Sequence, residues 1–112
     1  MNKNHLYKGT LMTVILQLLS EQGKMYGYEI AKRAKDLTKG DLDITEGALY
    51  PALHKLEAQG FLDVERVKVG NRTRKYYKLT ESGGKEAKLK ISELAEFVNN
   101  LQNLLNPQVV NG

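Results

Sequence analysis

The chain has 112 residues, a net charge of +4 and no cysteine. This length suits one domain, which can bury roughly two thirds of its unfolded surface without covalent cross-links. The lack of cysteine excludes disulfides, thiolate metal sites and thiol redox chemistry. No run of about 18 apolar residues predicts a membrane span, and the polar start from Met1 to Lys8 lacks the apolar core of a secretion signal. We therefore expect a cytoplasmic protein.

The positive charge is concentrated in one segment. Between Val64 and Lys78 there are six basic residues and one acidic residue, whereas the C-terminal third is nearly balanced. A basic segment on an otherwise balanced chain is typical of a surface that contacts phosphate groups.

Apolar residues recur at helical spacing in two segments of the first half. The first segment runs from Lys8 to Leu19 and is expected to end at Gly23. Its apolar stripe consists of Leu11, Val14, Ile15, Leu18 and Leu19. The second segment runs from about Tyr26 to Leu37. Its shared face consists of Ile30, Ala31, Ala34 and Leu37, and the small alanines predict close packing against another helix.

A third helix is predicted to begin after Thr45, whose side chain suits the N-cap, and to end at Gly60. Its inward stripe would consist of Leu49, Ala52, Leu53 and Leu56. Pro51 breaks a local rule because it removes a backbone donor and crowds the carbonyl of Gly47. Either the helix kinks at Pro51 or it starts late.

After Phe61 the apolar period changes from the helical value to two, which predicts strands. Leu62 and Val64 alternate with acidic residues, but Val67 and Val69 alternate one residue out of phase with them. A β-bulge near Arg66 is expected to absorb this slip.

The basic segment is predicted to form a β-hairpin with its tip at residues 70–73. Gly70 and Asn71 tolerate the positive φ that tight turns require. On the returning strand, alternation predicts that Tyr77 and Leu79 face inward, whereas Tyr76 and Lys78 face outward.

The last helix is predicted to run from its N-cap, Thr80, to Leu105, a length of roughly 39 Å at ~1.5 Å per residue. Its apolar residues step by four and three, which is the a/d seam of a coiled coil. The seam consists of Ala87, Ile91, Leu94, Val98, Leu101 and Leu105. Pro107 ends the helix, and the residues after it are expected to be frayed.

These elements predict a mainly α fold with a small β-hairpin. Residues 1–79 fit a winged helix-turn-helix DNA-binding domain, residues 80–106 a C-terminal dimerisation helix, and residues 107–112 a frayed tail. The third helix would enter the major groove of double-stranded DNA, and the basic hairpin would reach phosphates or the minor groove. The predicted DNA-binding residues are Thr45, Tyr50, His54, Lys55, Asn71, Arg72, Arg74, Lys75 and Tyr76.

The long last helix has no partner within so small a domain. Exposing its apolar seam would be costly, so we expect a homodimer in preference to a helix folded back on its own domain. Two third helices would then reach successive major grooves, about 34 Å apart. The predicted interface, which could also hold a small apolar effector, consists of Leu11, Ile15, Leu18, Ile91, Leu94, Val98, Leu101 and Leu105. A dry, packed interface is the alternative to an effector pocket.

Four ordered motifs resemble the PadR family of transcriptional regulators. They are Tyr26–Ile30 (YGYEI), Gly47–Leu53 (GALYPAL), Leu56–Leu62 (LEAQGFL) and Arg74–Gly83 (RKYYKLTESG). The resemblance spans about residues 8–105. It implies a homodimer that represses transcription at a palindromic promoter site and is released by a small molecule or another signal. It also implies that Pro51 lies within the recognition helix.

This chain departs from the family pattern at two positions. Ala48 stands where Thr or Ser is usual, so one hydroxyl contact to DNA is absent. Short members that resemble multidrug sensors stack flat compounds on a tryptophan of the last helix, but Leu94 occupies that position here. Drug stacking is therefore not expected, whereas an apolar pocket lined by Leu11, Ile15, Leu94 and Val98 stays open as an alternative.

Two other classes of protein are alternatives to a transcriptional regulator. An enzyme is not expected, because no Ser, His and acid have a recognisable arrangement and Gly83-Gly84 lacks the residues of a phosphate loop. His54 and Glu57 lack further ligands, so neither a metal nor a cofactor is expected. The remaining alternative is a protein-interaction module that uses the C-terminal seam without binding DNA.

Overall fold

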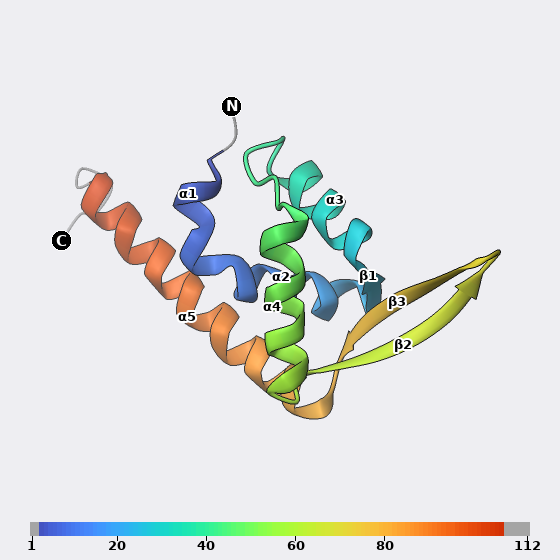
Figure 1. Cartoon of the computed structure of the whole chain (residues 1–112). Coiled ribbons are helices and arrows are strands. Elements are labelled where there is room, and N and C mark those ends of the chain that lie inside the picture. The colour runs from blue at the N-terminus through green and yellow to red at the C-terminus, as the bar shows by residue number, and fades with distance from the viewer. Residues whose placement is uncertain (1–2, 107–112) are drawn as a thin grey trace.

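The computed structural model describes residues 3–106, and the predicted helices and hairpin occur in it in the expected order (Figure 1). The fold is mainly helical with a small antiparallel sheet, as the sequence predicts. In chain order the elements are α1 (Asn4–Tyr7), the 3₁₀ helix η1 (Lys8–Thr10), α2 (Leu11–Gln22), β1 (Lys24–Tyr26), α3 (Gly27–Leu37), α4 (Glu46–Ala58), β2 (Leu62–Val69), β3 (Arg72–Leu79) and α5 (Glu81–Leu105). Within the described residues, no helix combines the length and apolar character needed to cross a membrane.

The first predicted helix differs from the observed one at its N-terminal end. A 3₁₀ turn precedes α2, and the Thr10 hydroxyl donates a hydrogen bond to the Tyr7 carbonyl, at 2.8 Å, within it. The α-helix therefore begins at Leu11 and runs on to Gln22. Gly23 ends it with φ = +86°, which confirms the predicted stop.

A short strand, β1, was not predicted from the sequence, which assigned Tyr26 to a helix. Met25 pairs with Tyr77 of β3, so β3 becomes the central strand in the order β1-β3-β2. The predicted hairpin is thus part of a three-stranded sheet. Three residues are too few to show a period of two, which is why the pattern did not reveal this strand.

The predicted bulge near Arg66 is wrong. The register between β2 and β3 is continuous, from Leu62 opposite Leu79 to Val69 opposite Arg72. Val67 and Val69 therefore lie on the opposite face of the ribbon from Leu62. Because the end of the hairpin projects beyond the body of the domain, its apolar residues need not share one buried face (Figure 1).

The turn at the tip of the hairpin is tighter than predicted. Only Gly70 and Asn71 separate the two strands, and Gly70 has φ = +63°. On β3, Tyr77 is buried and Leu79 is partly buried, as expected from alternation.

Helix α4 confirms the predicted cap and passes through Pro51. The Thr45 hydroxyl oxygen accepts a hydrogen bond from the Ala48 backbone nitrogen at 3.2 Å. The helix spans Glu46–Ala58 without a break, so it does not start late. Gly60 follows with φ = +83°. The predicted inward residues are all buried, namely Leu49, Ala52, Leu53 and Leu56.

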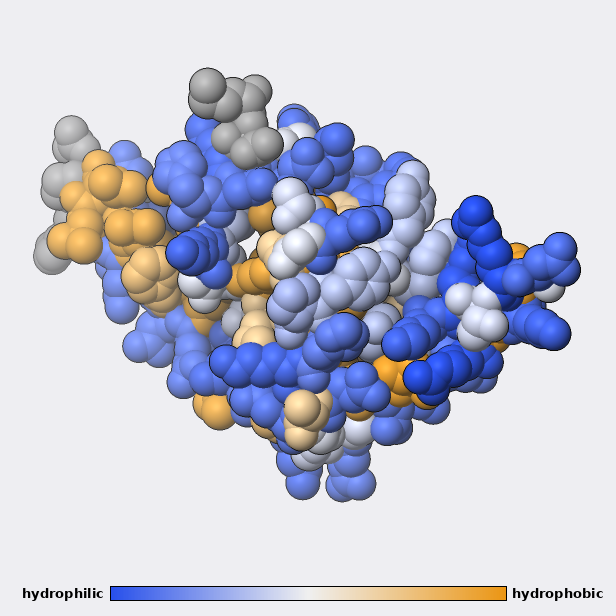
Figure 2. Space-filling view, in the orientation of Figure 1, coloured by the Kyte–Doolittle hydropathy of each residue, from blue (hydrophilic) through white to orange (hydrophobic). Residues whose placement is uncertain are grey.

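Helix α5 also begins as predicted, because the Thr80 hydroxyl oxygen accepts a hydrogen bond from the Gly83 nitrogen at 3.0 Å. Its first half crosses α2, and its second half projects away from the body of the domain (Figure 1). Along the seam, exposure rises from 1% at Ala87 to 46% at Val98 and 69% at Leu105. Figure 2 shows this apolar end as an orange patch. The frayed tail predicted for residues 107–112 lies outside the described residues.

Tyr77 lies at the centre of the core, where its side chain is 1% exposed. Within residues 3–106, its hydroxyl has no hydrogen-bond partner. Burial raises the pKa of Tyr77 above the ordinary value of 10.0, and the nearby Tyr50 and Glu57 raise it further. The folded state therefore favours the neutral phenol.

Replacing Tyr77 with phenylalanine is expected to keep the free energy of unfolding at neutral pH, or to raise it by up to about 1 kcal/mol, because a desolvated hydroxyl is removed. In the wild type, stability is retained below pH 10.0 and lost as the pH rises above it, since the unfolded chain then ionises more readily. The variant lacks this loss. Urea denaturation at neutral and alkaline pH measures both effects, with Tyr28→Phe as the exposed control. A large loss of stability at neutral pH would contradict the expectation.

Candidate nucleic-acid interface

The buried stripe of α4 sets which of its side chains face solvent. Leu49, Leu53 and Leu56 are each at most 2% exposed. Their burial turns His54 and Lys55 outward, and both are exposed. Thr45 is also exposed at the start of the helix. Three of the predicted DNA-binding residues therefore lie on accessible parts of α4 and its cap.

Tyr50 lies against the start of α3 and is only partly exposed. A Cβ atom built on Gly27 would be 2.5 Å from the Tyr50 hydroxyl oxygen. The ring can occupy this position only because residue 27 has no side chain. Tyr50 thus fixes how α4 packs against α3.

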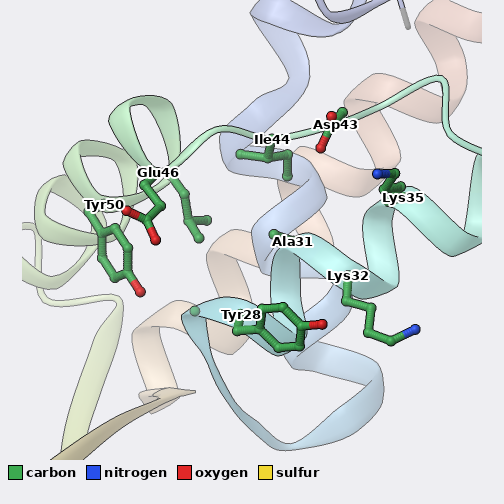
Figure 3. A pocket seen from close by; sticks show the side chains of 10 residues that line it. Tyr28, Ala31, Lys32, Lys35, Asp43, Ile44, Glu46 and Tyr50 are labelled. Atoms are coloured by element: carbon green, nitrogen blue, oxygen red, sulfur yellow. The ribbon is translucent and has the colours of Figure 1, made fainter. Parts of the chain in front are cut away.

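A pocket of about 310 Å³ separates α3 from α4. Figure 3 shows Tyr28, Lys32 and Lys35 along α3, with Glu46 and Tyr50 along α4. Lysine and carboxylate side chains both line it, and Tyr28 is 64% exposed at its rim. The pocket is a mainly apolar cleft with charged groups of both signs, at the N-terminal end of α4.

One face of the hairpin carries Arg66, Lys68 and Lys75. Arg66 is directly opposite Lys75. By strand alternation, these three side chains lie on the same face of the hairpin as the buried Tyr77. Tyr50 and Glu57 of α4 and Arg66 of β2 all influence the pKa of Tyr77. We call the surface formed by Arg66, Lys68 and Lys75 the inner basic face.

No ion pair among residues 3–106 includes a side chain of the inner basic face. Like charges directly opposite each other on adjacent strands repel, so an anion placed between them would relieve this repulsion. Arg66 and Lys68 were absent from the predicted site because the bulge expected near Arg66 left the faces of these two residues unassigned. The out-of-phase residues Val67 and Val69 were the signal that could have revealed it.

The predicted hairpin residues are divided between two faces. Lys75 belongs to the inner basic face, and Asn71 lies in the turn at the tip. Arg72, Arg74 and Tyr76 occupy the opposite, outer face. The structure therefore does not bring all predicted phosphate contacts to one surface.

On the outer face, aromatic rings and cations contact one another. The Arg74 guanidinium lies 4.2 Å from the centre of the Tyr26 ring. The Tyr26 ring meets the Tyr76 ring edge to face, with centres 5.4 Å apart. Lys24 lies 5.5 Å from the centre of the Tyr76 ring. Cations and aromatic faces at these distances attract one another electrostatically.

An ion pair at the edge of this cluster joins β1 to β2. The Lys24 ammonium donates a hydrogen bond to the Glu65 carboxylate at 2.6 Å. This hydrogen bond and the attraction between the charges lower the pKa of Glu65 and raise the pKa of Lys24. Both groups are therefore charged at neutral pH, and the negative charge of Glu65 is offset locally.

An apolar groove of about 580 Å³ runs between α2 and α5. Leu18, Ile91, Leu94 and Val98 of the predicted interface line it. Ile15 does not, because it is 0% exposed in the core. Leu11 lines a separate pocket beside α1. The predicted pocket of Leu11, Ile15, Leu94 and Val98 is therefore corrected, since Ile15 and Leu11 face other parts of the domain.

Within residues 3–106, no group of three or more histidine, aspartate and glutamate side chains is placed to hold a metal ion.

Solved structures of transcriptional regulators share this fold. A PadR family regulator from Eggerthella lenta is 31% identical, with a TM-score of 0.76 over 90% of this chain and 86% of the other. A regulator from Clostridium thermocellum is 32% identical, with a TM-score of 0.75 over 96% of this chain and 99% of the other. Bacillus subtilis PadR, solved in complex with operator DNA, is 32% identical, with a TM-score of 0.63 over 70% of this chain and 44% of that chain.

Sequence relatives and a family model give the same result. A Lysinibacillus sphaericus protein, named protein X, is 31% identical over 97 residues, which are 86% of this chain and 84% of that protein. The Escherichia coli transcriptional regulator YqjI is 35% identical over 75 residues, which are 67% of this chain and 34% of YqjI. Residues 15–89, most of the chain, match the model of the transcriptional regulator PadR-like family. The chain therefore belongs to the PadR-like family of transcriptional regulators.

Proposed function

We propose that this protein is a homodimeric repressor that binds a palindromic promoter site in the bacterial cytoplasm. The observation that carries the proposal is the inner basic face, whose cations have no acidic partner among residues 3–106 and lie on the α4 side of the hairpin. Similarity to Bacillus subtilis PadR, which was solved in complex with operator DNA, supports DNA binding.

In this proposal α4 enters the major groove, which is wide enough for one helix. Thr45, His54 and Lys55 are the accessible side chains that would approach base edges or the adjoining phosphates. The inner basic face would contact phosphates beside the groove, which adds affinity without reading sequence. Ala48 is exposed and offers only a methyl group, which suits an apolar contact with a thymine methyl.

The proposed dimer uses the projecting half of α5. Val98, Leu101 and Leu105 are between 40% and 69% exposed, and they continue directly from the apolar groove between α2 and α5. A second copy of α5 would cover this continuous apolar surface. A twofold axis between the two copies would present two α4 helices to successive major grooves, which accounts for a palindromic site.

In this proposal a signal releases the repressor through the groove between α2 and α5. The groove between α2 and α5 has an apolar lining that would suit a small apolar effector. Because the groove adjoins the proposed dimer surface, an occupant would alter how the two copies pack. Leu94 contributes an aliphatic wall, which favours a ligand held by shape over one held by ring stacking.

The test of DNA binding is a salt titration with a DNA fragment taken from upstream of the protein's own coding region. Fluorescence anisotropy is expected to show affinity that falls steeply with salt, because bound cations on the DNA are released. Arg66→Ala should weaken binding to every sequence tested. It should also reduce the log–log slope by about 0.9 for each phosphate that the variant no longer neutralises.

The matched control is Lys88→Ala, which removes the same charge from an exposed position on α5. It should leave both the affinity and the slope close to those of the wild type. Equal effects of the two variants would remove the inner basic face from the proposal. No DNA affinity at low salt would contradict the repressor function and favour the protein-interaction module.

A further inference from the structure

The first turn of α3 contacts both the hairpin and α4. Tyr26 is the last residue of β1 and the N-cap of α3, and its backbone nitrogen donates a hydrogen bond to the Glu29 carboxylate at 3.0 Å. The hydrogen bond fixes the backbone at the point where the strand becomes a helix. The Tyr26 ring is therefore held in a defined place relative to both elements.

The Tyr26 ring is the centre of the aromatic cluster. Arg74 of β3 lies over it at 4.2 Å, and Tyr76 meets it at 5.4 Å between ring centres. Tyr28 lies nearly parallel to it, with centres 6.3 Å apart and an angle of 20° between the planes. Arg74 is partly buried, unlike the exposed Arg72 and Lys75 on either side of it.

The neighbouring residue, Gly27, provides the contact with α4. The Tyr50 ring occupies the space where a side chain at position 27 would lie, and a Cβ atom there would be 2.5 Å from the Tyr50 hydroxyl oxygen. Two consecutive residues at the start of α3 therefore hold the hairpin through Arg74 and α4 through Tyr50. This turn therefore contributes to the orientation of the hairpin relative to α4, beside the direct contacts between α4 and β2.

We propose that the first turn of α3 is a joint that helps to fix the hairpin relative to α4, and that Arg74 is a positioning residue of this joint. The sequence pattern predicted a phosphate contact for Arg74. Its guanidinium instead lies over Tyr26, on the face of the ribbon opposite the inner basic face. The inference rests on the proposed DNA binding, because positioning matters only if α4 and the hairpin bind one duplex.

The joint acts by preorganisation. A two-stranded ribbon that projects into solvent would otherwise move, and ordering it on binding would cost free energy. The contact between Arg74 and Tyr26 orders it before DNA arrives. Removing the contact should therefore lower affinity while every phosphate stays neutralised, so the salt slope should be preserved.

The DNA-binding arm of the test compares four variants by anisotropy across a salt series. Arg74→Ala and Tyr26→Leu should each lower affinity about tenfold, which corresponds to a typical cation–π contact. Tyr26→Phe keeps the ring and should bind as the wild type does. The Tyr26→Leu/Arg74→Ala double variant should be no weaker than either single variant, since both remove the same contact.

The slope of affinity against salt distinguishes a positioning role of Arg74 from a direct contact with phosphate. Arg74→Ala should keep the wild-type slope, whereas Arg66→Ala should reduce it by about 0.9 for each phosphate that is no longer neutralised. An equal reduction in Arg74→Ala would overturn the inference and assign Arg74 a direct phosphate contact. Additive effects in the double variant would overturn it as well.

A second arm tests the joint in the free protein and is independent of DNA binding. Hydrogen exchange of the backbone amides of residues 65–76 should be faster in Tyr26→Leu and Arg74→Ala than in the wild type, and unchanged in Tyr26→Phe. Exchange elsewhere in the described chain reports whether each variant stays folded. Unchanged exchange in Tyr26→Leu would overturn the joint even if DNA binding is found. Faster exchange without any DNA affinity would retain the joint and reject the proposed function.

Discussion

Replacing Gly83 with alanine is expected to lower the free energy of unfolding by about 3 kcal/mol, the upper end of the usual cost of overpacking. A Cβ atom at this position would lie 2.0 Å from the Phe61 carbonyl oxygen, so backbone must move. That movement would disturb the hydrogen bonds from Thr80 N to Phe61 O and from the Thr80 hydroxyl to Gly60 O, at 3.0 and 2.7 Å. Urea denaturation followed by circular dichroism measures the loss.

Gly84→Ala is the matched control, one residue further along the same helix. A Cβ atom there meets nothing within 4 Å. Alanine in a helix should therefore stabilise the fold by roughly 0.5–1 kcal/mol through its higher helix propensity. If the two variants had equal stability, the close packing of α5 on the turn between α4 and β2 would be refuted.

Val98→Glu is expected to convert the proposed dimer largely to monomer at micromolar concentration. Val98 is 46% exposed at the middle of the projecting seam and lines the apolar groove. A carboxylate at this position would be desolvated in a dimer and would have no cation to pair with along the seam. Sedimentation velocity measures the distribution of monomer and dimer.

Asn100→Glu is the control for charge on the same helix. Two residues further on, position 100 faces about 200° away from the seam, and it is exposed. This variant should sediment as the wild type does. Equal behaviour of Val98→Glu and the wild type would remove the seam from the proposed interface, whereas monomeric wild-type protein would reject the dimer itself.

The caps and stops of the helices were predicted because each depends on residues close in sequence. Thr45 and Thr80 bond to backbone nitrogens three residues away, and Gly23 and Gly60 adopt positive φ where a helix ends. The inward stripe of α4 was also predicted, since the helical spacing of apolar residues can be recognised within a segment of a few turns.

The division of the site between two faces could not be predicted in the same way. Whether Arg66 and Arg74 share a face depends on the register with the opposite strand, and a bulge would have changed the answer. The contact of Arg74 with Tyr26 joins residues 48 positions apart, through a strand too short to be recognised. No sequence pattern around Tyr26 or around Arg74 indicates that the two residues are in contact.

The sequence alone determined the order of the main helices and the hairpin, the caps of α4 and α5, the basic segment and the resemblance to PadR regulators, because these depend on residue types and on spacings of a few residues. Only the tertiary structure decided that Ile15 is enclosed in the core, that Leu18 and Val98 line one groove, and that Tyr26 holds Arg74. The physical reason is that burial and ring–cation contacts arise where separate segments pack, and packing is a property of the folded chain as a whole.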